Sequence, residues 1–129
     1  MKLKTLLIIK AIVALCLGIP VLIVPVFMYS IFGASLSAGS IFPAREYGAA
    51  LIGIMLLTWF ARNSQESDAR WAIVLALFVY DAIGAIVTLI AILCGSLNQL
   101  AWMIVVLYLL LAGGFGYFLI PGKKPVLGS

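Results

Sequence analysis

Residues 71–94, WAIVLALFVYDAIGAIVTLIAILC, contain a single charged side chain, Asp81. An apolar run of this length can cross the ~30 Å hydrocarbon core of a bilayer as one helix, which needs about 20 residues. The whole chain shares this character, since 66% of its 129 residues are hydrophobic and 9% are charged. A soluble domain carries about 25% charged residues. The stretch therefore indicates an all-α integral membrane protein.

Four apolar segments are separated by short stretches rich in polar residues, glycine or proline, which mark the ends of the spans. The predicted spans cover about 5–32, 43–61, 69–94 and 97–120. Pro43 is expected to open the second helix, because a missing N–H costs nothing in a first turn. Ser67 is expected to cap the third helix, and Pro20 and Pro25 are expected to kink the first. The sequence predicts one domain, residues 1–129, folded as an antiparallel four-helix bundle.

The positions of lysine and arginine predict the orientation, because positive residues are retained on the cytoplasmic side. With four spans, both termini and the loop 62–70 share one side, which holds Lys2, Lys4, Arg62, Arg70, Lys123 and Lys124. Lys10 can snorkel to that side if the first helix starts early, and the opposite side has only Arg45. We expect a multi-pass protein of the cell inner membrane with both termini cytoplasmic. A signal peptide is the alternative for the N-terminus, but Lys10 interrupts its apolar region.

The residue inventory removes several kinds of site. The chain has no histidine, which excludes a bis-histidine haem, histidine-based metal sites and Ser-His or Cys-His catalysis. Its two cysteines do not form a C-x-x-C motif, which argues against thiol oxidoreductase chemistry. Most basic residues fall at span ends, so no nucleic-acid partner is inferred. We expect no cofactor, no metal and no enzymatic activity.

Asp81 is the first candidate functional residue. At about 1.5 Å per residue it lies ~15 Å beyond Trp71, close to the membrane midplane. An ionised carboxylate there costs at least ~2.5–3.5 kcal/mol, so it is expected to be protonated, hydrogen-bonded or paired. The same helix face carries small and polar residues at i+3, i+4 and i+7, namely Gly84, Ala85 and Thr88. Such faces allow close helix packing in lipid, so Asp81 is expected to face the bundle interior.

A second face of small residues follows Arg45 in the second span, at Gly48, Ala49 and Gly53. The two faces are expected to pack against each other. Arg45 has two interpretations. It is either the partner of Asp81, with help from helix tilt, water or Tyr47, or an interfacial residue that snorkels to the outer surface.

Three further residues have structural interpretations. Glu46 lies in the first turn of the predicted second helix, where an acid favours the positive end of the helix dipole, or it is simply solvated. Gly113 and Gly116 in the fourth span allow close approach of a neighbouring helix. That neighbour is either internal or a second subunit.

Three segments carry a family resemblance: REYGAALIG at 45–53, LTWFARN at 57–63 and ARWAI at 69–73. Together they resemble a pattern found in small four-span bacterial membrane proteins of unknown function, broadly similar to the DoxX-like group. The resemblance covers most of the chain from Arg45 onward. It implies a four-helix inner-membrane bundle and assigns no catalytic residues.

Two classes of function follow. The first is a non-catalytic accessory or scaffold subunit, which packs against lipids or other membrane subunits or self-associates through its small-residue faces. The alternative is a small proton- or cation-coupled transporter in which Asp81 exchanges the ion, similar in size and span number to small multidrug transporters.

Overall fold

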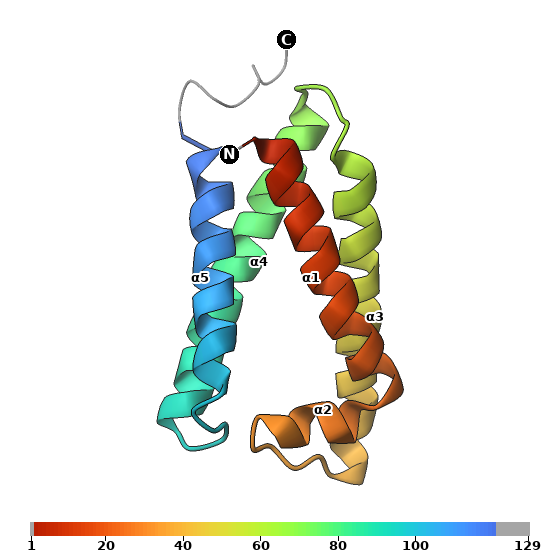
Figure 1. Cartoon of the computed structure of the whole chain (residues 1–129), viewed down its shortest axis with the longest axis vertical. Helices are drawn as coiled ribbons and strands as arrows, with labels where there is room; N and C mark the ends of the chain where they lie inside the picture. The colour runs from red at the N-terminus through yellow and green to blue at the C-terminus, as the bar shows by residue number, and fades with distance from the viewer. Residues whose placement is uncertain (1, 121–129) are drawn as a thin grey trace.

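The computed structural model describes residues 2–120 of the chain. Within this part the fold is all-α, with five helices and no strands (Figure 1). The helices are α1 (Leu3–Ile23), α2 (Pro25–Ile31), α3 (Ala38–Ala61), α4 (Asp68–Leu93) and α5 (Ala101–Tyr117). The all-α prediction is confirmed.

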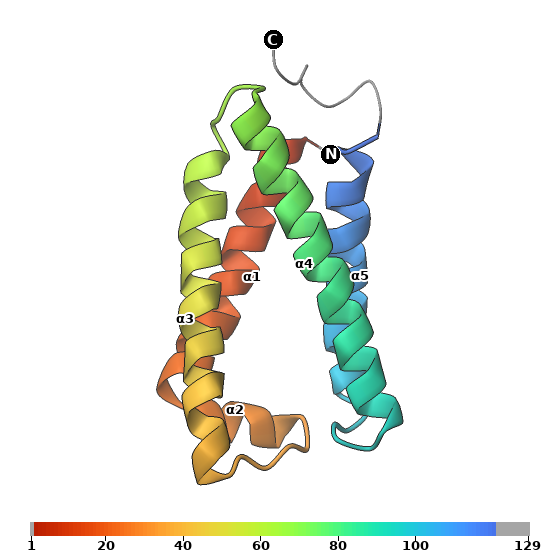
Figure 2. The same ribbon diagram turned by 180° about the vertical axis from the view of Figure 1, so that it is seen from behind.

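The helices α1, α3, α4 and α5 form two antiparallel pairs (Figures 1 and 2). α1 packs along α3, and α4 packs along α5. The pairs meet at a narrow end, which holds the start of α1, the α3–α4 loop and the end of α5. They separate toward the opposite, wide end, where the short helix α2 lies across the space between them. The fold is therefore splayed at one end, whereas a regular four-helix bundle stays closed along its length.

The predicted first span, 5–32, is not one continuous helix. α1 ends at Ile23 and α2 begins at Pro25, because Val24 has φ −128° and ψ 62°, outside the helical region. Pro25 has no N–H to donate to the preceding turn, and its ring disfavours helical geometry in the residue before it. Pro20, by contrast, lies inside α1. The residues of α2 therefore leave the direction of α1 and run across the wide end (Figure 1).

The start of α3 contradicts the prediction that Pro43 opens the second span. α3 begins at Ala38, after Ser37 in an extended conformation, and Pro43 lies inside the helix. The Ser40 N–H donates to the Ser37 carbonyl at 3.0 Å, which closes a turn ahead of the proline. The helix therefore tolerates a proline at a position where one backbone hydrogen bond is lost.

The start of α4 agrees with the sequence. The Ser67 hydroxyl oxygen accepts a hydrogen bond from the Arg70 N–H at 3.1 Å, in the manner of a helix N-cap. Such a cap satisfies one of the backbone donors that the first turn leaves unpaired, and it contributes about 1 kcal/mol. The predicted cap is confirmed.

Helix α5 is shorter than the predicted span 97–120, but hydrogen-bonded turns extend it in both directions. At its start the Ala101 N–H donates to the Asn98 carbonyl at 3.1 Å. At its end the Ile120 N–H donates to the Tyr117 carbonyl at 3.3 Å. Tight turns of this i to i+3 kind are common at the ends of α-helices. The helical path of the backbone is therefore longer than α5 itself.

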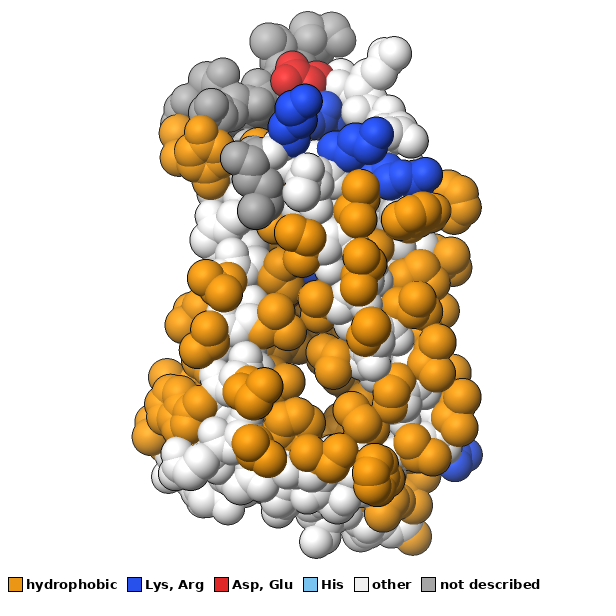
Figure 3. Space-filling view, viewed as in Figure 1, with side chains coloured by type: hydrophobic (Ala, Val, Ile, Leu, Met, Phe, Trp, Pro, Cys, Tyr) orange, Lys and Arg blue, Asp and Glu red, His pale blue; other side chains and the backbone are white. Residues whose placement is uncertain are grey.

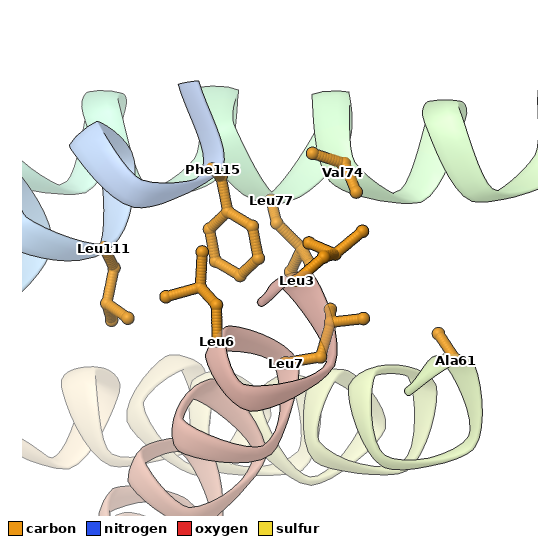
Figure 4. Close-up of a cluster of buried hydrophobic side chains, with 8 residues drawn as sticks. All are labelled: Leu3, Leu6, Leu7, Ala61, Val74, Leu77, Leu111 and Phe115. Carbon is orange, nitrogen blue, oxygen red and sulfur yellow. The ribbon is translucent and has the colours of Figure 1, made fainter. Parts of the chain in front are cut away.

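A hydrophobic core lies at the narrow end, where α1, α3, α4 and α5 all contribute side chains (Figure 4). In α1, Leu6 and Leu7 point toward Phe115 of α5, Leu77 of α4 and Ala61 of α3. The cluster is completed by Leu3, Val74 and Leu111. Because side chains from all four helices pack into it, this cluster holds the two pairs together at the narrow end.

Large apolar side chains cover the outer surface of the molecule (Figure 3). Every helix contributes exposed examples, such as Ile12, Phe27, Phe60, Ile86 and Leu110. Among the described residues, α1, α3 and α4 are long and apolar enough to cross a membrane, and α5 is a shorter apolar helix. Lysine and arginine side chains gather at the narrow end (Figure 3). A soluble protein does not expose apolar surface on this scale, so the chain is a membrane protein.

Candidate functional site

Lys10 of α1 and Asp81 of α4 form an ion pair between the two helix pairs. Lys10 Nζ lies 2.6 Å from Asp81 Oδ1, a short charge-assisted hydrogen bond. The two residues are 2% and 0% exposed, so protein atoms shield both charges. The pair therefore connects α1 with α4 inside the part of the protein that we treat as membrane-embedded.

Helical spacing explains why both charges face inward. Buried positions recur every three or four residues along α1, and Lys10 belongs to that row together with Leu3, Leu6, Leu7, Ala11, Ala14, Gly18 and Val21. Asp81 belongs to the corresponding row of α4, with Val74, Leu77 and Ala85. Residues three and four apart share one face of a helix. The two buried rows therefore bring the lysine and the aspartate to the same interface.

Aromatic rings surround the ammonium group of Lys10. Its Nζ atom lies 4.7 Å from the centroid of the Tyr80 ring and 5.9 Å from that of Tyr108, within the range of cation–π attraction. Asp81 Oδ2, on the other side of the pair, is buried and has no hydrogen-bond partner among the described residues. A buried ion is tolerated only when its charge is compensated. Lys10 provides that compensation through one of the two carboxylate oxygens.

For two basic residues, the structure corrects one expectation and decides between two interpretations. Lys10 does not snorkel to the predicted cytoplasmic side, because its place in the buried row of α1 turns its side chain inward. Of the two interpretations of Arg45, the structure excludes the pairing with Asp81 and agrees with an exposed residue. Arg45 is exposed in α3, beside Val24 and Pro25. Glu46 is exposed as well, but it does not lie in the first turn of the helix as predicted, because α3 begins at Ala38.

Three tyrosine hydroxyl groups, from α3, α4 and α5, meet next to the ion pair. The hydroxyl oxygens of Tyr47 and Tyr108 are 2.7 Å apart, and the Tyr80 hydroxyl donates to Tyr47 at 3.2 Å. The Tyr80 and Tyr108 oxygens are farther apart, at 3.5 Å. We call Tyr47, Tyr80 and Tyr108 the tyrosine triad. It is a second polar connection between the pairs, because Tyr47 belongs to one pair and the other two belong to its neighbour.

A cavity of about 480 Å³ lies beyond the tyrosine triad, toward the wide end. Its walls are mostly apolar and include Leu17 and Val21 of α1, Ile83 and Val87 of α4 and Ile104 of α5. None of the described residues that line it carries a charge. Figure 3 shows a hollow between the helix pairs, bordered by apolar side chains. The volume falls within the range of about 300–1,000 Å³ that is typical of small-molecule sites.

Helix α2 bounds this cavity at the wide end and is tied to the α4–α5 turn. The Asn98 N–H donates to the Phe32 carbonyl at 2.8 Å, and the Asn98 side-chain amide donates to the Ile31 carbonyl at 3.0 Å. We call these two hydrogen bonds the Asn98 clasp. Gly33 allows the close approach, because it has φ +82° and a Cβ there would lie 3.1 Å from Asn98 Cβ. The clasp joins the two helix pairs across the wide end.

The small-residue faces of α3 and α4 do not pack against each other, contrary to the sequence prediction. A Cβ atom at Gly48 would lie 2.6 Å from the backbone nitrogen of Leu22, so this face of α3 packs on α1. A Cβ atom at Gly84 would lie 2.8 Å from the ring of Tyr108, so this face of α4 packs on α5. Each face therefore serves the contact within its own helix pair.

The remaining predicted residues divide between the interior and the outer surface. Ala85 is buried, and the Thr88 hydroxyl donates to the Gly84 carbonyl of its own helix at 2.7 Å. A Cβ atom at Gly116 would lie 3.0 Å from the ring of Phe78. Three candidates face outward: Ala49, Gly53 and Gly113. Apart from the adjacent residues and backbone of its own helix, no described atom lies within 4 Å of a Cβ atom built at Gly53 or Gly113.

Comparisons with protein-family models, with curated proteins and with solved structures find no match for this chain. The site is therefore defined by its own geometry: a compensated charge pair, a tyrosine triad and an uncharged cavity. Residues 2–120 hold no group of three or more His, Cys, Asp or Glu side chains that could bind a metal ion. Sequence reasoning did not identify four residues of this site, Lys10, Tyr80, Tyr108 and Asn98. The sequence did hold a sign that Lys10 is buried, because its spacing places it in the apolar row of α1.

Proposed function

We propose that the chain is a four-span protein of the cell inner membrane that acts as a non-catalytic accessory or scaffold subunit, packing against lipids or other membrane subunits. The ion pair is the observation that carries this proposal. Lys10 and Asp81, which lie among the apolar helices, form an ion pair with each other at 2.6 Å. Charges arranged in this way hold two helix pairs together, which is a structural task. The likeness to DoxX-like four-span proteins belongs to the same proposal.

The four-span arrangement is supported by α5. Its 17 residues rise only about 26 Å, but the turns at Asn98 and Ile120 lengthen the helical path toward the ~30 Å of a bilayer core. α5 also packs along α4. We therefore count it as a span beside α1, α3 and α4.

The orientation is supported by the distribution of charge. The narrow end carries the exposed Lys2 and Lys4 together with Arg62 and Arg70 of the α3–α4 loop. The region of the wide end has Arg45. Positive residues are retained in the cytoplasm, so the narrow end and both termini are placed there. Lys123 and Lys124, which belong to the same prediction, lie outside the described residues.

Cysteine labelling tests this topology. Gln65→Cys in the α3–α4 loop and Ser96→Cys in the α4–α5 turn would be made singly after replacement of Cys16 and Cys94 by alanine. A membrane-impermeant maleimide added to spheroplasts should label Ser96→Cys at once, and Gln65→Cys only after permeabilisation. Labelling of both positions from the same side would contradict the four-span arrangement.

The accessory role is tested at the outward-facing glycines. Small residues let helices approach closely in lipid, and Gly53 and Gly113 have open space beside them. A tagged protein, solubilised mildly from native membranes, should carry a stoichiometric companion or a second copy in mass spectrometry. Gly53→Leu or Gly113→Leu should release it, whereas Ala76→Leu, on an exposed position of α4, is the matched control. A monodisperse wild-type monomer without any companion would contradict the proposal.

A proton-coupled carrier is the second candidate, and the free oxygen of Asp81 favours it. Asp81 Oδ2 is buried without a hydrogen-bond partner among the described residues, and Tyr80, its neighbour in sequence, lines the cavity. Asp81→Asn, which cannot exchange a proton, should then abolish proton flux measured with an enclosed pH dye in proteoliposomes. Equal flux through the wild type, the variant and empty liposomes would eliminate the carrier.

A further inference from the structure

The lining of the cavity favours an uncharged ligand. Its polar groups are hydroxyls: the tyrosine triad at one end, together with Tyr29 and Thr88. The Thr88 hydroxyl proton is already donated to the Gly84 carbonyl. Moving an ion into a site without a compensating charge is costly. The lining therefore selects a neutral molecule with a long apolar part and a small polar group.

The number of donor protons and acceptor lone pairs in the tyrosine triad defines that polar group. Three hydroxyls supply three protons and six lone pairs. Two protons are used in the bonds at 2.7 and 3.2 Å, whereas the third has a partner only at 3.5 Å, the limit of a hydrogen bond. The triad can thus donate one stronger hydrogen bond and still accept others. A hydroxyl group on a ligand can accept that proton and donate its own to a free lone pair.

The route into the cavity points to the bilayer as the source of the ligand. α2 and the Asn98 clasp bound the cavity at the wide end, which faces the outer aqueous phase in the proposed topology. On the side, the hollow between the helix pairs opens onto apolar surface (Figure 3). A molecule that enters by this side comes from the hydrocarbon region. Its polar group then meets the triad, which is the hydrogen-bonding end of an otherwise apolar site.

We propose that the cavity between the helix pairs binds a neutral lipid with a free hydroxyl group, the class of long-chain alcohols and acylglycerols. The hydrocarbon chain of the lipid lies against Leu17, Val21, Ile83, Val87 and Ile104, and its hydroxyl group forms hydrogen bonds with the tyrosine triad. The inference rests on the membrane placement proposed above, but not on the accessory role.

Photolabelling in nanodiscs of phosphatidylcholine tests the inference. The probe is hexadecanol with a diazirine in its chain, and the controls are the same chain without the hydroxyl and with a carboxylate in its place. Peptides of α4 and α5 that line the cavity should be labelled about two- to tenfold more strongly by the alcohol than by either control, the range expected for one net hydrogen bond. Equal labelling by the alcohol and the hydrocarbon would overturn the inference, as would stronger labelling by the carboxylate.

Two kinds of variant locate the effect. Replacement of all three tyrosines of the triad by phenylalanine keeps the rings and removes every hydroxyl, so it should lower labelling by the alcohol to the level of the hydrocarbon. Ala91→Trp fills the cavity and should abolish labelling, whereas Ala76→Trp, on the outer face of the same helix, should leave it unchanged. The comparison uses variants that keep the circular dichroism spectrum and the elution volume of the wild type.

The remaining outcomes separate this inference from the proposed function. Labelling that survives Ala91→Trp would place the alcohol on the outer surface and overturn the inference. Failure of all probes to label the cavity, in a protein whose cysteine labelling places the α3–α4 loop and the α4–α5 turn on opposite sides of the membrane, would overturn the lipid site alone and leave the topology intact.

Discussion

The buried ion pair between Lys10 and Asp81 should respond differently to the loss of one partner and to the loss of both. At a separation of 2.6 Å and an effective dielectric constant of ~20, the Coulomb attraction is about 6 kcal/mol. Desolvation costs several kcal/mol for each ion, so the attraction and the cost nearly cancel. Lys10→Met or Asp81→Asn alone should therefore destabilise the fold by about 3–5 kcal/mol, because each leaves an uncompensated buried charge. The double variant Lys10→Met with Asp81→Leu should recover most of that loss.

The assay is unfolding in mixed micelles, followed by circular dichroism as the fraction of denaturing detergent is raised. Asp81→Leu completes the double-mutant cycle, in which the coupling energy between the two positions should be at least about 2 kcal/mol. Arg45→Met is the matched control, since Arg45 is exposed and its loss should change the free energy of unfolding by no more than about 0.5 kcal/mol. Additive effects of the two single variants, within about 0.5 kcal/mol, would refute the reasoning.

Two further predictions concern helix packing and the wide end. Gly48→Ala should destabilise the protein by about 1–3 kcal/mol, because its Cβ atom would meet the backbone of Leu22 at 2.6 Å. Gly53→Ala, which has open space, should instead stabilise α3 by up to about 1 kcal/mol, and the reverse order in thermal melts would show that the α1–α3 contact is misplaced. Asn98→Ala should raise amide hydrogen exchange in α2, because it removes the side-chain bond of the Asn98 clasp, whereas Gln99→Ala should not. Unchanged exchange in the first variant would show that the clasp does not hold α2.

Features that depend on a single helix and on the medium around it, lipid or water, could be predicted from the sequence. The apolar run around Asp81 predicted a membrane-spanning helix. Because an ionised carboxylate in hydrocarbon is costly, Asp81 was expected to be protonated, hydrogen-bonded or paired. The structure places this residue at 0% exposure. The cap at Ser67 followed equally from local chemistry, because a serine hydroxyl ahead of an apolar run satisfies free backbone donors.

Features that depend on which helices are neighbours could not be predicted in the same way. Helical spacing indicates which residues share a face, but not which face of another helix they meet. Arg45, which precedes a face of small residues, was therefore considered as the partner of Asp81, and Lys10 was assigned to the membrane surface by its nearness to the N-terminus. The break at Pro25 had a local signal, but only the tertiary fold shows that α2 turns across the wide end and meets Asn98.

The pairing of Lys10 with Asp81 is the central claim, and solid-state NMR of the protein in lipid bilayers tests it most directly. With ¹⁵N-labelled lysine and ¹³C-labelled aspartate, dipolar recoupling measures the distance from lysine Nζ to aspartate Cγ, and Asp68→Asn removes the other aspartate of the chain. Because Lys10 Nζ lies 2.6 Å from Asp81 Oδ1, we expect a correlation at under about 4 Å that disappears in Lys10→Met. A missing correlation in the wild type, or one that persists in Lys10→Met, would contradict the account.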